Sequence, residues 1–527
     1  MKKYTWGRKA IHSGRGQAIH SGHESRGEAP GRGQAIAPTM DAIPFHDVER
    51  GWSHFVHGRG DGLSSPWVGG RGLLAGRNKL RPYYMLITLL ILLTACSGLS
   101  GTGNNGSATP AATLHSSSTD IATKPTPTQV DTCPDLVGYP ASHTYCYTPH
   151  QFRVAYGVES LIEQGFTGKG QTVVDIVSFG SPTLQQDMDA FDRQFGLPPI
   201  TLQIIAPLGT KTFDPASKDM QGWAGETTLD VQIIHAIAPD AGIVVLTSPV
   251  SETEGTIGLP EFLQLEQYAL DHHLGNIVSQ SWGASEVTLK DAVGQQEIQK
   301  WDTFFQKATT QQGITFFASS GDNGATDYSD LQATKLSPTA TTSFPTDDPW
   351  VTSTGGTTIT RNGTAIQEQA WNSNGGASGG GFSAFFPTPS FQKTLPSSIQ
   401  NQLQNRRGVP DVAGAADPLT GLACDEAGQW FLSSGTSASA PLWAGLMAIA
   451  NQMAGHPLGF INAALYKLAM SDHYTQDFRD ITVGNNNVNA KGVVLTGYAT
   501  AVGWDPVTGW GTPNAAKLLP DLIAATK

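Results

Sequence analysis

Residues 227–247, TTLDVQIIHAIAPDAGIVVLT, join a helical stretch to a short apolar strand. The same alternation recurs along the chain. Other apolar runs of strand length are TVVDIV (172–177), NIVSQS (276–281) and ITFFAS (314–319), and a second long helical stretch is QQEIQKWDTFFQKATTQ (295–311). Strands that alternate with helices form a parallel sheet with helices on both faces. The sequence therefore predicts an α/β fold with a single large domain from Tyr147 onward.

A serine at the start of a helix is the first candidate for chemistry. Residues 434–441 read SGTSASAP and precede the apolar, helix-forming run LWAGLMAIANQ. Gly435 permits a tight turn, and Pro441 is tolerated within the first helical turn. Ser437 would then lie where free backbone N–H groups and the positive end of the helix dipole stabilise an oxyanion. Ser437 is therefore a candidate peptidase nucleophile, although most such Ser and Thr clusters only cap a helix.

The base that such a serine needs is usually a histidine, but none of the 14 histidines lies in a recognisable catalytic motif. Upstream, Glu226 and Asp230 are four residues apart, so on a helix they share one face. A solvated face is the ordinary interpretation of such a pair, but neighbours such as Leu229 and Val231 make this helix too apolar for the surface. Two carboxyl groups on a buried helix share a proton, and one pKa is raised. Such a pair can accept a proton from Ser437 in acid, where histidine is already charged.

A third carboxyl group follows a predicted strand. The apolar run from Ile314 to Ala318 is ended by SSG, which places Asp322 at the carboxyl end of a strand. Ligands of open α/β sheets bind at that edge. A protonated Asp322 facing Ser437 can donate a hydrogen bond to an oxyanion, whereas an Asp322 in an ordinary turn has no such role.

With these residues in this order, the chain resembles the sedolisins, a family of serine-carboxyl peptidases with a subtilisin-like fold. The resemblance covers roughly Tyr147 to Thr512. It rests on YTPHQFRVAYGV, GKGQTVVDIVSFGSPTL, GETTLD, SQSWGASE, ASSGDNG, SFPTDDPWVTSTGGT, GGGFSAFFPTPSFQ, RGVPDVAGAADPLTG and SGTSASAP. The fold that it implies is a subtilisin-like parallel sheet flanked by helices on both faces.

The resemblance also implies roles for individual residues. Ser437 would be the nucleophile, Glu226 the general base, Asp230 its orienting partner and Asp322 the acid that stabilises the oxyanion. Trp282, in SQSWG, would lie beside the strand that binds substrate. An aromatic ring packed beneath that strand is the equally supported alternative for Trp282.

A calcium site is expected near the C-terminus. Asp480 and Asp505 supply carboxylates among glycine-rich turns, and oxygen-only ligation suits calcium. The similarity to the sedolisin calcium site adds the backbone carbonyls of Ile481, Ala501 and Gly503. We expect one structural Ca²⁺ ion here, although two aspartates on glycine-rich turns are ordinarily only turns.

The chain before the predicted catalytic domain divides into three parts. Residues 1–84 form a basic, repetitive segment, and we expect translation to begin after it, at Met85. Residues 85–96 combine an apolar run, LITLLILL, with LTAC, which together resemble a bacterial lipoprotein signal with Cys96 as the lipidated residue. A signal peptide without lipid and an uncleaved anchor are the alternatives. Residues 97–146 form a tether rich in Ser, Thr and Pro.

Charge and cysteine content agree with export. The whole chain has a net charge of −12, but residues 1–84 carry 13 Lys and Arg against 6 Asp and Glu, so the remainder carries −19. Such an acidic remainder predicts an extracellular enzyme with no nucleic-acid partner. Cys133 and Cys146 can close a small disulfide loop, which leaves Cys424 unpaired.

These features together predict a secreted or surface-anchored serine-carboxyl peptidase that acts on proteins or peptides through an acyl-enzyme. We expect endopeptidase activity, highest at acidic pH, with tripeptidyl-peptidase action as an open alternative. The protein is expected to be a monomer attached to the membrane through its N-terminal lipid or signal anchor. A histidine-dependent subtilisin-type protease and an inactive surface binding module on the same fold are the other classes considered.

Overall fold

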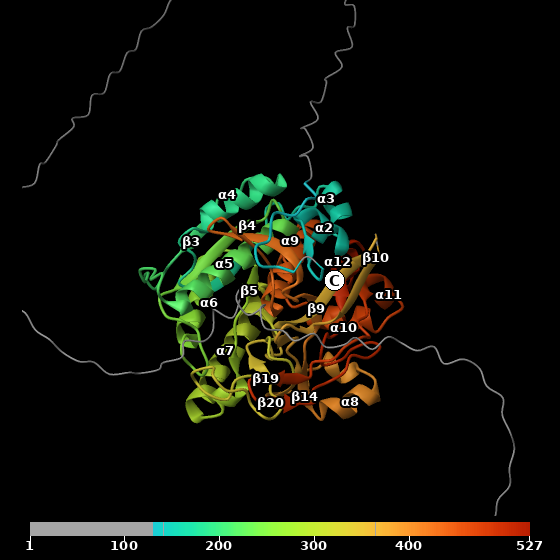
Figure 1. Ribbon diagram of the computed structural model, residues 1–527. Helices are drawn as coiled ribbons and strands as arrows, with labels where there is room; N and C mark the ends of the chain where they lie inside the picture. The colour runs from blue at the N-terminus through green and yellow to red at the C-terminus, as the bar shows by residue number, and fades with distance from the viewer. Residues whose placement is uncertain (1–129, 141, 364) are drawn as a thin grey trace, which may run out of the picture. The chain divides into compact units, whose positions relative to one another are not determined.

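A computed structural model of the chain describes residues 130–140, 142–363 and 365–527. Its largest sheet follows the order β10-β9-β7-β5-β2-β4-β3, with β15 paired to β9 (Figure 1). All of its pairings are parallel except that of β10 with β9. The strands are β2 (Thr172–Ser178), β3 (Gln203–Ile205), β4 (Gly242–Ser248), β5 (Ile277–Gln280), β7 (Thr315–Ser319), β9 (Thr352–Asn362), β10 (Ala365–Ala370) and β15 (Val412–Ala415). The predicted parallel α/β sheet is confirmed.

Helices cover both faces of this sheet, because its strands are apolar on both sides. In β2, Val173 and Val177 pack in a core with α5 (Lys218–Ile237) and α9 (Ser439–Ala454). Val174 and Ile176 pack in a second core with α6 (Leu259–Asp271) and α7 (Ala292–Gln312). Side chains alternate between the faces of a strand, so Asp175 shares the face of Val173 and Val177, toward α5.

Smaller elements complete the domain. The remaining helices include α2 (Pro149–Ala155), α3 (Glu159–Glu163), α4 (Leu184–Phe195), α8 (Ser397–Leu403), α10 (Asn462–Ala469), α11 (Tyr474–Asp477) and α12 (Ala515–Ala525). The remaining strands are β1 (Tyr145–Tyr147), β6 (Ala284–Ser285), β8 (Ser343–Phe344), β11 (Asn372–Ser373), β12 (Gly376–Ala377), β13 (Gly381–Pro387), β14 (Arg406–Val409), β16 (Thr420–Glu426), β17 (Gln429–Leu432), β18 (Phe478–Arg479), β19 (Val488–Ala490), β20 (Val493–Leu495) and β21 (Thr512–Pro513). In Figure 1 the C-terminal helices α10, α11 and α12 lie close together.

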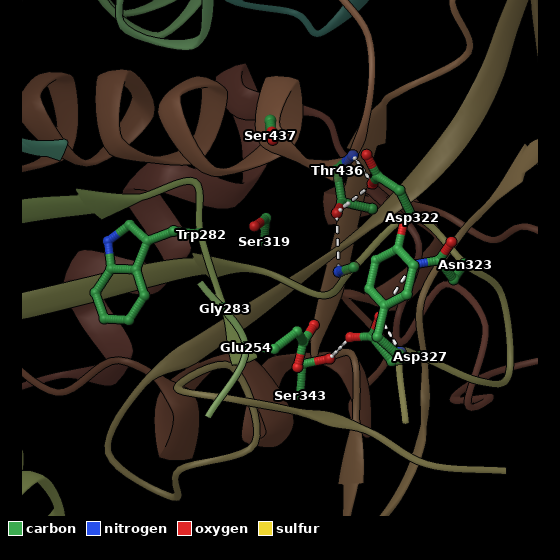
Figure 2. A pocket seen from close by; sticks show the side chains of 12 residues that line it. Glu254, Trp282, Gly283, Ser319, Asp322, Asn323, Asp327, Ser343, Thr436 and Ser437 are labelled. Carbon is green, nitrogen blue, oxygen red and sulfur yellow. Dashed lines mark hydrogen bonds between the residues drawn. The ribbon is translucent and has the colours of Figure 1, made fainter. Parts of the chain in front are cut away.

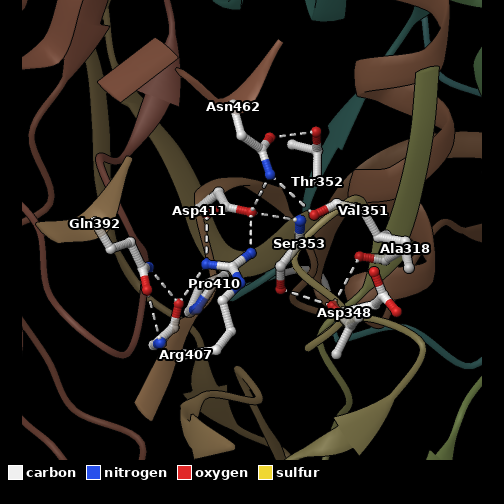
Figure 3. Close-up of polar contacts among 12 residues, drawn as sticks. Ala318, Asp348, Val351, Thr352, Ser353, Gln392, Arg407, Pro410, Asp411 and Asn462 are labelled. Carbon is white, nitrogen blue, oxygen red and sulfur yellow. Dashed lines mark hydrogen bonds and ion pairs between the residues drawn. The ribbon is translucent and has the colours of Figure 1, made fainter. Parts of the chain in front are cut away.

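A buried ion pair joins the segment after β14 to the central sheet (Figure 3). Arg407 and Asp411 are fully buried, and Arg407 donates to both carboxylate oxygens of Asp411, at 2.8 and 2.6 Å. Asp411 also accepts a bond from the backbone N–H of Ser353, on β9, at 2.9 Å, and from the Tyr466 hydroxyl at 2.9 Å. These additional donors satisfy the carboxylate, as a buried charge requires.

The folded region includes residues before Tyr147. Cys133 and Cys146 form the disulfide that the sequence permits, while Cys424 is buried and free. Strand β1 pairs in parallel with β16, and Leu136 and Tyr139 pack against the larger core. The described part of the expected tether, residues 130–140 and 142–146, therefore contributes to the domain.

The other N-terminal features lie outside the described residues. These are the basic segment 1–84, the signal segment 85–96 with Cys96, and residues 97–129 of the tether. Among the helices of the described ranges, none combines the length and apolarity needed to cross a membrane.

Candidate active site

Ser437 lies on a one-turn 3₁₀ helix, Thr436–Ala438, directly before α9. Its position at the N-terminus of α9 agrees with the sequence prediction, and Pro441 occupies the first turn of that helix. Gly435 has φ +76°, and a Cβ atom there would lie 2.5 Å from Asp322 Oδ2. Both the backbone conformation and the close approach of Asp322 therefore require glycine at position 435.

Glu226 and Asp230 lie one turn apart on α5, as predicted. Asp230 is fully buried, and Glu226 Oε1 is buried without a hydrogen-bond partner among the described residues. Ser281, directly after β5, places its Oγ 2.7 Å from Asp230 Oδ1 and 3.1 Å from the backbone oxygen of Ser437. This hydroxyl links Asp230, on α5, to the segment that carries Ser437.

Burial dominates the ionisation of this carboxyl pair. It raises the pKa of Glu226, a side-chain hydrogen bond with Ser437 opposes the rise, and the charges of Asp322 and Asp175 add to it. Burial likewise holds the pKa of Asp230 well above its usual range, with further increases from Asp175 and Glu226. The pair therefore retains a proton at pH values where exposed carboxyl groups are ionised.

Asp322 follows β7 and faces the turn of Ser437. Its Oδ1 accepts bonds from the backbone N–H of Thr436 at 2.7 Å and from the Thr436 hydroxyl at 2.9 Å. Burial raises the pKa of Asp322, and the two bonds from Thr436 oppose that rise. Because Oδ1 is the acceptor, Oδ2 is the oxygen that can carry a proton.

A further carboxyl group, Asp175, was missed by the sequence analysis. It is fully buried on β2, and burial raises its pKa to about 8, while a hydrogen-bonding interaction with Asp230 opposes the rise. Two carboxyl groups form such a bond only when one of them is protonated. The available signal was an aspartate inside the apolar strand TVVDIV, since a charge in a buried strand needs a partner.

Ser437 and Asp322 line a cavity of about 170 Å³ (Figure 2). Figure 2 shows Ser437, Thr436 and Asp322 toward one end, and Glu254, Ser343 and Asp327 toward the other. Burial raises the pKa of Glu254 to about 8, and the charge of Asp327 adds to the rise. Asp327 accepts a hydrogen bond from Ser343. The cavity thus has Ser437 at one end and two buried acids at the other.

Trp282 borders the same cavity, but its ring lies in the core. It is 5% exposed, and its ring centroid is 4.9 Å from that of Phe262 and 5.7 Å from that of Trp301. In Figure 2 the ring points away from Asp322. This placement favours the packing alternative for the side chain of Trp282.

The predicted calcium ligands converge on the loop 501–503. Asp480 Oδ2 accepts a bond from the backbone N–H of Gly503 at 3.0 Å, and Asp505 Oδ2 accepts one from Ala501 at 2.9 Å. Asp480 Oδ1 is buried with no partner among the described residues. Within the same described ranges, no hydrogen bond reaches the backbone oxygens of Ile481, Ala501 or Gly503. Free carbonyl oxygens beside an unpartnered carboxylate oxygen fit an oxygen-coordinated cation.

Comparisons with known proteins identify the family. No model of a known protein family matches the chain. Kumamolisin from Bacillus sp. (strain MN-32) is 33% identical over 387 residues, which cover 72% of this chain and 64% of kumamolisin. Tripeptidyl-peptidase 1 from Homo sapiens is 30% identical over 410 residues, with coverage of 71% and 64%. The chain thus spans about 64% of the length of these relatives.

A solved structure resembles the described fold. It is that of Pseudomonas sedolisin, a serine-carboxyl proteinase, complexed with two molecules of pseudo-iodotyrostatin. The TM-score is 0.60 at 29% sequence identity, and the match covers 72% of this chain and 98% of the sedolisin chain. Together with the sequence relatives and the parallel sheet, it shows that the chain belongs to the sedolisin family and has its subtilisin-like fold.

Proposed function

We propose that this protein is a serine-carboxyl peptidase in which Ser437 is the nucleophile and Glu226 the general base. The observation that carries the proposal is that the side chain of Ser437 interacts with Glu226, whose carboxyl group is raised in pKa by burial and by the charges of Asp322 and Asp175, and which shares α5 with the buried Asp230. No histidine lines the cavity that holds Ser437, within the described part of the chain. A carboxyl base therefore explains the site better than a histidine base does.

The proposed reaction has two halves. Ser437 Oγ attacks the peptide carbonyl carbon while its proton passes to Glu226, and the Asp322 carboxylic acid donates a hydrogen bond to the oxyanion. The C–N bond then breaks as Glu226 returns the proton to the leaving amine. Water attacks the resulting ester and gives one proton to Glu226, and the C–O bond to Ser437 then breaks as Glu226 returns that proton to Ser437 Oγ, which releases the acid product. Asp230 holds the Glu226 carboxyl in place and shares its charge.

The protonation state sets the expected pH dependence. Catalysis needs Glu226 ionised while Asp322 is protonated, so the active form carries one negative charge on the two groups. Loss of the proton from Asp322 at higher pH removes the donor to the oxyanion. Protonation of Glu226 at lower pH removes the base. We propose that this form is most populated on the acid side of neutrality.

The direct test replaces the proposed nucleophile and the proposed base in turn. Ser437→Ala and Glu226→Gln should each lower peptide hydrolysis by about four to six orders of magnitude, because nucleophile and base act as a unit. Circular dichroism and thermal unfolding verify that each variant is folded. A folded Glu226→Gln enzyme with substantial activity would exclude the mechanism, and a fluorophosphonate probe that fails to label wild-type Ser437 in acid would favour an inactive binding module.

We propose endopeptidase action on protein or peptide substrates. Glu254 and Asp327 line the cavity beyond Ser437, and both are largely buried. When Glu254 and Asp327 are protonated, the cavity should accept uncharged polar side chains of the substrate. When they are ionised, it should favour substrate side chains that carry a positive charge. Cleavage profiles of a peptide library at several pH values distinguish internal cleavage from removal of N-terminal tripeptides, and they show whether basic side chains gain preference as the pH rises.

The cofactor, the location and the oligomeric state are also proposals. Asp480 and Asp505, with the carbonyls of Ile481, Ala501 and Gly503, would hold one structural Ca²⁺. The disulfide between Cys133 and Cys146 is consistent with an oxidising compartment. We propose a monomer that is exported and anchored through a lipid on Cys96. Loss of lipid labelling and of membrane retention in Cys96→Ser tests the anchor, and sedimentation of the purified protein tests the oligomeric state.

A further inference from the structure

A second group of metal-ligating side chains lies on the C-terminal helices, apart from the predicted calcium ligands. His473, the residue before α11, Asp477 at the end of α11, and Asp521 on α12 each offer one ligand atom, and these atoms lie within 4.8 Å of one another. Helices α11 and α12 are in contact and lie close together in Figure 1. Residues separated by more than 40 positions in the sequence thus converge on one point.

Asp477 is the residue that points to a ligand. It is fully buried, and no N–H or O–H group of the described residues donates a hydrogen bond to its carboxylate oxygens. Burial raises the pKa of Asp477, and the neighbouring Asp521 carboxyl group raises it in the same direction. A buried carboxylate without a donor is costly, because it loses its hydration and gains no bond in return. A cation bound between Asp477 and its neighbours would compensate for that loss.

The neighbours of Asp477 have the right chemistry for that cation. His473 Nδ1 lies 2.7 Å from Asp521 Oδ2, and these two side chains are 52% and 34% exposed. No lysine or arginine forms an ion pair with Asp477 or Asp521 in the described ranges. The cluster therefore combines two carboxylates with an imidazole, and its outer side is open to solvent.

We propose that His473, Asp477 and Asp521 bind a divalent cation of the zinc type. An imidazole nitrogen with two carboxylate oxygens is a ligand set for zinc rather than for calcium, and water can complete a tetrahedron on the open side. Ligand atoms of a tetrahedral zinc site are about 3.3 Å apart, given metal–ligand distances of about 2.0 Å. The side chains of His473, which is exposed, and Asp521, which is partly buried, can reach that spacing by small rotations around the fixed Asp477.

The cation would join α11 to the C-terminal helix. Asn514, directly before α12, already donates its backbone N–H to the backbone oxygen of Asp477 at 2.7 Å. Metal ligation would add a side-chain link between the same two segments. Because binding occurs only in the native state, it would raise the thermal stability of the protein. This role does not depend on the peptidase activity.

The test is a calorimetric titration of metal-free, full-length protein with zinc chloride at pH 7, in excess calcium chloride so that the predicted calcium ligands are occupied. We expect one zinc ion per chain and a higher melting temperature with zinc. His473→Gln and Asp477→Asn should each weaken zinc binding at least tenfold and remove the gain in melting temperature. Asp472→Asn and His456→Gln, which alter exposed residues outside the cluster, should bind zinc like the wild type.

The titrations distinguish zinc binding at His473, Asp477 and Asp521 from nonspecific zinc binding to the protein surface. Absence of zinc binding by the wild type overturns it, as does unchanged zinc affinity in His473→Gln and Asp477→Asn. Equal competition by calcium would exclude a zinc-type preference. If Asp477→Asn fails to fold, His473→Gln still decides the question, because His473 lies on the surface.

Discussion

At the residue scale, the site depends on carboxyl groups that influence one another through a buried interior. Glu226, Asp230 and Asp175 lie on two elements, α5 and β2, and Asp322 approaches from the end of β7. For Glu226 and Asp230, the charges of nearby carboxyl groups reinforce the effect of burial. The chemistry therefore belongs to the group as a whole, and substitutions that change one charge should move the behaviour of the others.

Asp175 provides one such substitution. When it is ionised, Asp175 raises the pKa of Glu226 and Asp230, so Asp175→Asn should lower the pKa of both and shift the pH–rate profile to lower pH. We expect the shift in kcat, with little change in KM, since Asp175 does not line the cavity. Asp302→Asn, a partly buried carboxyl on α7 at the other face of the sheet, is the matched control. A profile identical to that of the wild type would mean that Asp175 has only a packing role.

Asp322 allows a comparison of two variants. Because Thr436 donates both of its bonds to Oδ1, the amide of Asp322→Asn can keep that acceptor and place its NH₂ group where the carboxylic acid donated. Asp322→Ala removes the donor, and we expect it to lose about 3 kcal/mol more transition-state stabilisation than Asp322→Asn. Steady-state kcat/KM for one peptide measures the difference. Equal kcat/KM values for Asp322→Asn and Asp322→Ala would mean that Asp322 only stabilises the turn and donates no hydrogen bond to the oxyanion.

At the element scale, the sequence predicted the strands and the long helices closely. The predicted strand from Ile314 to Ala318 is β7, Thr315–Ser319, and the helical run TTLDVQIIHAIA lies largely within α5. Apolar periodicity carries this information locally. Ser437 differs in detail, because it lies in a 3₁₀ turn that precedes α9.

Contacts between distant elements were harder to predict. Asp175 meets Asp230 because β2 packs beneath α5, and Glu254 reaches the cavity from the segment between β4 and α6. Neither residue belongs to a motif with a fixed spacing from Ser437. Their roles depend on tertiary packing, which the local pattern of residues does not specify.

The loop 501–503 supports a prediction about calcium. If Asp480 and Asp505 hold an ion with carbonyls of this loop, chelation should lower the melting temperature before it affects the chemistry, because the ion binds only the native state. Scanning calorimetry with and without chelator measures the effect, and Asp505→Ala should lose the response to calcium. A melting temperature unchanged by chelator in the wild type would count against the site.

At the scale of the whole molecule, several acidic side chains of the described residues are buried. Burial raises the pKa of each member of a set that comprises Asp175, Glu226, Asp230, Glu252, Glu266, Asp347 and Asp348. The folded state therefore binds protons that the unfolded chain releases above about pH 4. Four of these residues, Glu252, Glu266, Asp347 and Asp348, lie outside the carboxyl group cluster of α5 and β2, so the effect extends beyond the candidate site.

This proton binding predicts that the fold is more stable in acid than in alkali. A carboxyl group whose pKa is raised in the folded state contributes its full stability at pH values below its pKa in the unfolded chain, which is about 4. That contribution is lost as the pH rises through the pKa of the group in the folded state. For Asp175 and Glu226 that value is about 8. Urea unfolding of Ser437→Ala, which prevents self-digestion, should give a free energy of unfolding that falls by a few kcal/mol, to order of magnitude, between pH 5 and pH 9. A free energy that rises across this range would contradict the prediction.

The most direct test of the serine-carboxyl mechanism is the rate of peptide hydrolysis from strongly acidic to mildly alkaline pH. With Glu226 as base and Asp322 as acid, the profile should be bell-shaped, with its maximum on the acid side of neutrality. A histidine base, with a pKa of about 6.5, predicts activity that is lost in acid. Activity that rises through pH 7 and persists into alkali would contradict the assignment of Glu226 as the base.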